Sequence, residues 1–317
     1  MTDKRQGGGR GFKPSQQESS LQSDGITKAE YILRTLGLAS EKDRRKFLRK
    51  QNLPVSLYKF KSVNPEKPYI LEDIIVNSKL YLSSPQSFND LFDMKPHATV
   101  EGDLSTLLTK IKSLPAPSQK AKRDAMQRAR AIWREHGLNG IANEYRIQET
   151  IESLFADTGV FCFSTISPEA SRDTGPRNNL MWSHYGDSHG GVCLQFQVSK
   201  DPQMLQRLVK VTYSDRYPTI NWLSPSVEEE CLFAATNKQT SWTYEHEWRH
   251  VQLNKARTYT HFNPCLLTGI ILGAKITAES MTEVDRVLKM RAESGLPPLR
   301  KYYAQADRAS YKIRIFH

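Results

Sequence analysis

The chain has 317 residues, 38% of them hydrophobic, and a formal net charge of +11 from 45 Lys and Arg against 34 Asp and Glu. This length and hydrophobic content suffice for one large core with additions, and no run of about 18 apolar residues that could span a membrane occurs. The first residues are rich in glycine and arginine, unlike a secretory signal, so we expect a cytoplasmic protein without a membrane partner.

The four cysteines are scattered, and no two of them form a C-x-x-C pair. This spacing is typical of reduced thiols in a cytosolic protein, and it argues against a zinc site, because metal ligands usually come in close pairs. We therefore expect no metal. The four positions are Cys162, Cys193, Cys231 and Cys265.

The N-terminal part is expected to form two segments outside the main domain. Residues 1–26 are polar and glycine-rich, which predicts a disordered tail, and residues 27–55 predict a basic helical extension. The extension carries the densest positive cluster of the chain, and this cluster is the candidate contact for nucleic acid or another polyanion, although a solvated helix face also explains it. The cluster consists of Arg44, Arg45, Lys46, Arg49 and Lys50.

The next segments predict a strand, a helix and a second strand, followed by a helical insertion. Residues 56–60 alternate as in a strand, residues 71–77 predict a helix, and residues 79–83 predict another strand. A loop that mixes aromatic and polar residues follows, with Phe88, Asn89 and Asp90 as further pocket candidates, to which Arg249 is added from later in the chain. Residues 101–155 then predict an insertion of helices, with breaks at the prolines after residue 114 and at Gly137 and Gly140.

The stretch from Leu180 to Phe196 is the most distinctive part of the sequence. It places Trp182, His184, Tyr185 and His189 before the paired glycines Gly190 and Gly191, which lead into a short apolar run. Such a run predicts a buried strand, so the cluster should lie on the loop or short helix that precedes it. Polar side chains positioned in this way often carry function, but core aromatics and structural histidines explain the pattern equally well.

The remaining segments complete the prediction of a single domain over residues 56–317. Strands are predicted at 160–165, 209–213, 269–273, 301–304 and 311–316, with helices at 226–235 and 278–292, and residues 238–251 are expected to run from a loop into a further strand. Short strands separated by helices and long loops predict an α+β fold with a mixed or antiparallel sheet, a helical insertion and an N-terminal helical extension.

Six spaced motifs resemble, in order, a family of bacteria and phages known as domain of unknown function 2971. The first are residues 57–60 and the segment 80–90, followed by residues 161–164. Next come residues 181–185 with Gly190 to Cys193, then Trp242 with residues 245–249, and residues 270–273. The resemblance extends over roughly residues 56–316. It implies a setting among mobile and defensive genes, and hence a toxin or phage-defence effector.

The order of Lys59, Ser164-Thr165 and Glu245-x-Glu247 is also similar to that of ADP-ribosyltransferases of the arginine-serine-glutamate class, although these usually have Arg or His at the first position and Ser-Thr-Ser at the second. The resemblance implies NAD as the substrate that supplies the transferred group. Loss of nicotinamide leaves a positively charged ribose, which Glu247 would stabilise while Glu245 orients or deprotonates the acceptor. Lys59 would meet the diphosphate, and Tyr58, Trp182 or Tyr185 would stack on the nicotinamide.

Two other classes of function remain open from the sequence. The basic helices and exposed aromatics would also suit a module that binds nucleic acid without catalysis. A nuclease or hydrolase would use His184 and Asp90, together with Asp93, His189 and Glu247. The transferase pattern also has a purely structural explanation, in which Glu247 and Arg249 form an ion pair across a strand end, Ser164 caps a loop and Lys59 is solvated.

Overall fold

The computed structural model describes residues 53–166, 173–201, 204 and 208–317. The chain divides into two compact units, residues 1–53 and 54–317, and the described helices and strands belong to the second unit. The predicted tail and the basic cluster at residues 44–50 lie outside the described residues. In the part that is described, no helix is both long and apolar enough to cross a membrane.

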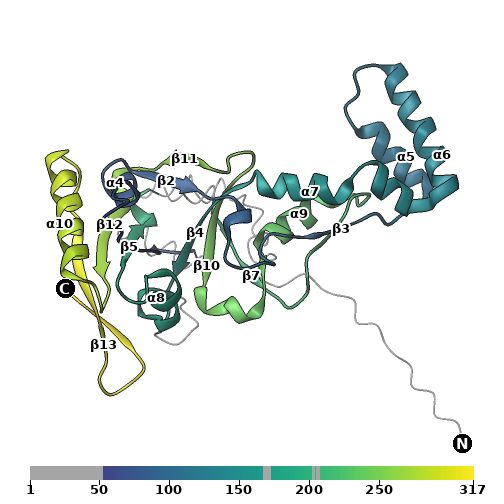
Figure 1. Cartoon of the computed structure of the whole chain (residues 1–317). Helices are drawn as coiled ribbons and strands as arrows, with labels where there is room; N and C mark the ends of the chain where they lie inside the picture. The colour runs from purple at the N-terminus through teal and green to yellow at the C-terminus, as the bar shows by residue number, and fades with distance from the viewer. Residues whose placement is uncertain (1–52, 167–172, 202–203, 205–207) are drawn as a thin grey trace, which may run out of the picture. The chain divides into compact units, whose positions relative to one another are not determined.

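A mixed sheet of eight strands forms the centre of this unit, and it confirms the predicted α+β class (Figure 1). Its strands are β1 (Ser56–Lys61), β4 (Gly159–Thr165), β5 (Val192–Gln197), β6 (Leu208–Lys210), β10 (Glu247–Gln252), β12 (Leu267–Leu272), β13 (Arg300–Ala306) and β14 (Ile313–Phe316). They lie in the order β14-β13-β12-β5-β1-β4-β10-β6, and the pairs within this sheet are antiparallel except for β12 with β13.

Short strand pairs surround the main sheet. They join β2 (Lys79–Leu82) to β11 (Thr258–His261), β3 (His97–Thr99) to β8 (Thr219–Asn221), and β7 (Thr212–Tyr213) to β9 (Asn237–Lys238). The sequence predicted β2 but not β3, β8 or β11, and the strand expected at 209–213 is divided between β6 and β7.

Seven helices are described in this unit. They are α4 (Tyr69–Ile75), α5 (Leu104–Ser113), α6 (Gln119–Glu144), α7 (Ile147–Ala156), α8 (Asn179–Tyr185), α9 (Val227–Thr236) and α10 (Ala278–Glu293). The predicted helical insertion corresponds to α5, α6 and α7, and its packing includes a small core around Leu107, Ile111 and Ile141. Gly137 has a non-helical backbone with a positive φ of 62°, which glycine adopts without steric cost, and it kinks α6 into two helical parts, so the predicted break at Gly137 is confirmed.

The paired glycine after α8 allows the first residues of β5 to approach β1 closely. A Cβ atom on Gly191 would lie only 2.3 Å from the main-chain oxygen of Lys61. Gly273, just after β12, is similarly restricted, since its Cβ would lie 2.2 Å from the oxygen of His189. Any side chain at Gly191 or Gly273 would collide with these main-chain oxygens. The two glycines therefore permit the close packing of the turn between α8 and β5 against the neighbouring strands.

Candidate functional site

A fork between two central strands forms the candidate site. β1 pairs with β4 only where Leu57 meets Thr165 and Tyr58 meets Ser164, whereas β1 pairs with β5 and β4 with β10 over six residues each. Beyond Tyr58 the two main chains separate, and a pocket of about 200 Å³ is lined by consecutive residues of both strands. We call this cavity the fork pocket.

The register of the sheet places three predicted site residues in one row. Tyr58 lies opposite Ser164, and Ser164 lies opposite Glu247 on the next strand. Cross-strand neighbours project from the same face of a sheet, so these side chains are adjacent. Ser164 Oγ also donates a hydrogen bond of 2.6 Å to the main-chain oxygen of Glu245, which fixes the turn that precedes β10.

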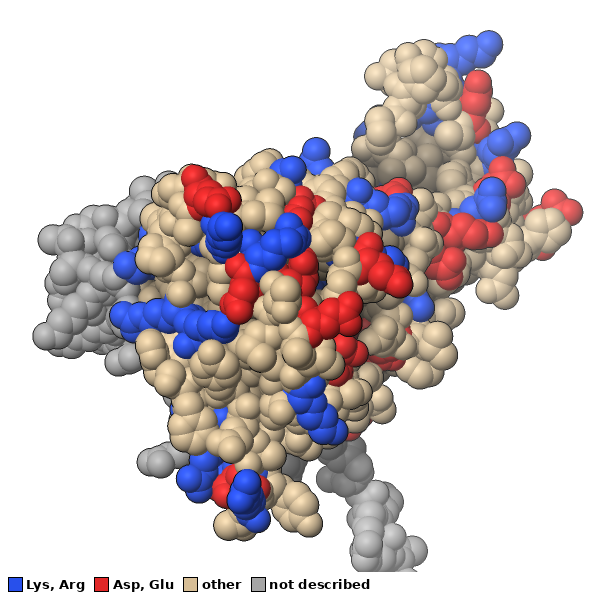
Figure 2. Space-filling view, turned by 60° about the vertical axis from the view of Figure 1, so that its left-hand side comes forward, with Lys and Arg blue, Asp and Glu red and all other residues tan. Residues whose placement is uncertain are grey.

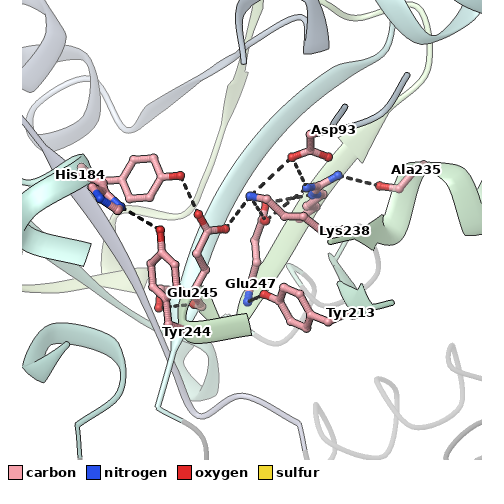
Figure 3. Close-up of polar contacts among 11 residues, drawn as sticks. Asp93, His184, Tyr213, Ala235, Lys238, Tyr244, Glu245 and Glu247 are labelled. Carbon is pink, nitrogen blue, oxygen red and sulfur yellow. Dashed lines mark hydrogen bonds and ion pairs between the residues drawn. The ribbon is translucent and has the colours of Figure 1, made fainter. Parts of the chain in front are cut away.

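Five buried charged residues form a network beside this row, which we call the polar cluster (Figure 3). Its members are Asp93, Lys238, Glu245, Glu247 and Arg249. Lys238 Nζ lies 2.6 Å from Glu245 Oε2, 3.2 Å from Glu247 Oε2 and 3.5 Å from Asp93 Oδ2. Arg249 contacts Glu247 Oε1 at 2.8 Å through Nε and Asp93 Oδ2 at 2.7 Å through a terminal nitrogen. Three carboxylates thus share two cations, which leaves one excess negative charge when all are ionised.

The two glutamates of the polar cluster have opposite pKa shifts. Burial raises the pKa of Glu245 to about 7, and the negative charge of Glu247 adds to this effect. Burial also acts to raise the pKa of Glu247, but the charges of Arg249 and Lys238 outweigh it and hold that pKa well below its usual value. Glu247 therefore keeps its charge while Glu245 exchanges a proton near neutral pH, the division of roles expected of an acid-base pair.

Two tyrosine hydroxyls form hydrogen bonds with the two glutamates of the polar cluster. Tyr185 Oη donates a 2.6 Å hydrogen bond to Glu245 Oε1, and Tyr213 Oη accepts one of 2.9 Å from the main-chain nitrogen of Glu247. Burial, followed by the charge of Glu245, raises the pKa of Tyr185 well above its usual value, so this hydroxyl remains a donor. His184 is exposed, and its Nδ1 lies 2.8 Å from Tyr244 Oη, as Figure 3 shows.

Most of the residues predicted for the site line the fork pocket. These are Tyr58, Lys59, Phe88, Asn89, Asp90, Ser164, Tyr185, Glu245 and Glu247. Four others do not line it. His184 lies outside, and Thr165 donates a hydrogen bond to the oxygen of Ser56. Trp182 is fully buried with its indole nitrogen donating to Pro176, and Arg249 lies in the polar cluster.

The residues that also line the fork pocket include Lys61, Cys162 and Lys238, to which the sequence analysis gave no role in the site. Lys238 belongs to no recognisable motif. Its place in the site could have been predicted only from the need of two neighbouring acids, Glu245 and Glu247, for a cation. Burial, and then the charge of Glu247, raises the pKa of the Cys162 thiol well above its usual value, so this thiol is a donor and not a nucleophile.

The structure can also be compared with the two other classes of function, a hydrolase and a nucleic-acid-binding module. Asp90 lines the fork pocket and His184 does not, so the pair named for a hydrolase is not brought together in this pocket. Among the described residues no group of three or more His, Cys, Asp and Glu is placed to hold a metal ion. On the face shown in Figure 2, basic side chains of the described part are interspersed with acidic ones.

Comparison with known proteins gives one match. Residues 181–250 match the model of a family described as protein of unknown function DUF2971. The DUF2971 match confirms the family resemblance over this part of the chain, which contains most of α8, all of β5 and the residues Lys238, Glu245, Glu247 and Arg249. No curated protein and no solved structure matches the chain.

Proposed function

We propose that the protein is an NAD-dependent enzyme that resembles ADP-ribosyltransferases and acts as a toxin or phage-defence effector. The observation that carries the proposal is the row of Tyr58, Ser164 and Glu247 that lines the fork pocket, with Glu245 fixed beside it. In the proposed activity, NAD supplies an ADP-ribosyl group whose bond to nicotinamide is broken.

The fork pocket suits one end of a dinucleotide. Its volume of about 200 Å³ is below the roughly 300–1,000 Å³ of clefts that enclose whole drug-sized ligands. It would therefore enclose the nicotinamide and its ribose, with the remainder of NAD extending outward. Phe88 and Tyr185 offer aromatic rings, Lys59 offers a positive charge for the diphosphate, and the excess negative charge of the polar cluster suits a group that becomes cationic.

The residues of the site divide the chemistry between them. As the bond from the ribose C1′ to the nicotinamide nitrogen breaks, its electron pair goes to that nitrogen, and a lone pair of the acceptor forms the new bond to C1′. Glu247 contributes a fixed negative charge against the positive charge that develops on the ribose, because Arg249 and Lys238 keep it ionised. Glu245 takes the proton that the acceptor loses, for which a pKa of about 7 is well placed.

The test is transfer of label from NAD that is radioactive in the adenylate part. The purified protein is incubated with this NAD and a cell lysate, and macromolecular label is counted for the wild type, Glu245→Gln and Glu247→Gln. We expect label transfer by the wild type, reduced at least about 100-fold in each variant, as for loss of a general base or a charge-stabilising group. The matched control is Glu149→Gln, an exposed glutamate of α7 that should transfer label normally.

Label transfer that persists in Glu245→Gln and Glu247→Gln would overturn the proposal, as would the absence of both label transfer and NAD loss in the wild type. Loss of NAD without labelled macromolecules would identify water as the acceptor. That result would keep the glycosidic cleavage and reject the transfer.

A further inference from the structure

Strand β1 presents two different sets of side chains on its two sides. Tyr58 and Phe60 pack in a core with Met181 and Trp182 of α8. Lys59 and Lys61 alternate with these residues along β1. Because successive side chains of a strand point to opposite faces, both lysines project from the face of β1 opposite to that of Tyr58 and Phe60. Both also line the fork pocket, where Lys59 Nζ lies 4.7 Å from the ring centroid of Phe161 on the opposite strand.

Within the part of the chain that the structure describes, neither lysine has a counter-ion. Among the described residues, no carboxylate lies within 4.0 Å of either ammonium group, whereas the buried acids of the same pocket are held by Lys238 and Arg249. Burial lowers the pKa of Lys61 to about 8, and the neighbouring charge of Lys59 adds to this shift. Two positive charges that repel each other in a partly buried wall are stabilised by an anion placed between them.

We propose that Lys59 and Lys61 together form a subsite for the diphosphate group of a nucleotide. Alternate residues of a strand are about 7 Å apart, and flexible lysine side chains at that separation can each reach one of two adjacent phosphates. Lys61 is thereby assigned a binding role that complements Lys59. The inference rests on the proposed function for the identity of the ligand, and it requires that a diphosphate binds where an uncharged nucleoside does not.

The test is isothermal titration calorimetry with pyrophosphate, ADP and the uncharged nucleoside adenosine as probes. We expect the wild type to bind pyrophosphate and ADP but not adenosine. Lys59→Gln and Lys61→Gln should each weaken ADP about tenfold to a hundredfold, as for loss of one charged hydrogen bond. Lys61→Arg should restore most of the affinity because it keeps the charge. Lys255→Gln, an exposed lysine outside the pocket, should bind ADP as the wild type does.

Three results would overturn the subsite: no binding of pyrophosphate or ADP by the wild type, equal binding by the glutamine variants with unchanged melting temperatures, or equal weakening by Lys255→Gln. A short single-stranded oligonucleotide that displaces ADP and binds more tightly would overturn it as well, since the lysines would then serve a polynucleotide. The outcome is separable from that of the proposed function, because binding of pyrophosphate and ADP is measured without any cleavage of NAD. A protein that binds ADP but never cleaves NAD would refute the reaction and keep the subsite.

Discussion

Replacing Glu245 by glutamine should remove a specific pH dependence of folding stability. The pKa of this carboxyl is raised from 4.5 to about 7 in the folded protein, first by burial and then by the charge of Glu247. Between these two values the folded state retains a proton that the unfolded state has released. The contribution of Glu245 to the free energy of unfolding is therefore fully present below pH 4.5 and is lost as the pH rises through about 7.

The magnitude follows from the width of this window. Each pH unit changes the free energy of unfolding by about 1.4 kcal/mol, and the window is about 2.5 units wide, which gives about 3 kcal/mol between pH 4.5 and 8. Glu247 acts in the opposite sense, because its pKa is lowered, and its contribution changes below pH 4.5. Glutamine at position 245 does not titrate, so Glu245→Gln should gain about 3 kcal/mol relative to the wild type over this range.

Urea unfolding followed by circular dichroism at pH 4.5 and 8 measures the effect. The difference in unfolding free energy between Glu245→Gln and the wild type should move in favour of the variant by about 3 kcal/mol as the pH rises. Glu149→Gln, at an exposed site, should differ from the wild type by less than about 0.5 kcal/mol at both pH values. A difference for Glu245→Gln that is the same at both pH values would refute the assignment of the raised pKa and the acid-base role built on it.

Three further predictions concern two residues beside Glu245 and one glycine after β12. Lys238→Met should cost about 3–5 kcal/mol in urea unfolding at pH 8, because it leaves buried carboxylates without their shared cation, and a loss below about 1 kcal/mol would contradict the polar cluster. Tyr185→Phe removes a hydrogen bond that lowers the pKa of Glu245, so the fall in stability should extend to higher pH, and an unchanged curve would speak against that bond. Gly273→Ala should cost about 1–3 kcal/mol by thermal or urea unfolding, since its Cβ would meet the oxygen of His189, and a variant as stable as the wild type would show that the chain relaxes there.

The regular elements of the sheet could be predicted because their patterns are local. Strands β1, β4, β5 and β12 have runs of apolar or alternating residues bounded by turn residues, and each was expected within a few residues of its position. Strands β3 and β8 have three residues each and pair with one another across a long stretch of chain, so no local pattern predicts them. Gly137 indicated a break in the helical insertion, and α6 is kinked there by a non-helical backbone conformation that glycine permits.

The site was predictable only where its residues are close in sequence or follow a motif. Glu245 and Glu247 stand two residues apart before a predicted strand, and Ser164 ends another strand, so both features were visible in the sequence. Lys238 and Asp93 come from β9 and from a distant loop, and only the folded register brings them together. Trp182 was predicted for the site but lies in the core. The sequence pattern around an aromatic residue does not indicate whether its side chain faces a pocket or the core.

Release of nicotinamide from NAD tests the central claim most directly. The purified protein is incubated with NAD that carries label in the nicotinamide ring, and free nicotinamide is separated and counted for the wild type, Glu245→Gln and Glu149→Gln. We expect steady release by the wild type and by Glu149→Gln, with a reduction of at least about 100-fold in Glu245→Gln. Release that is equal in all three proteins, or absent from the wild type at saturating NAD, would contradict it.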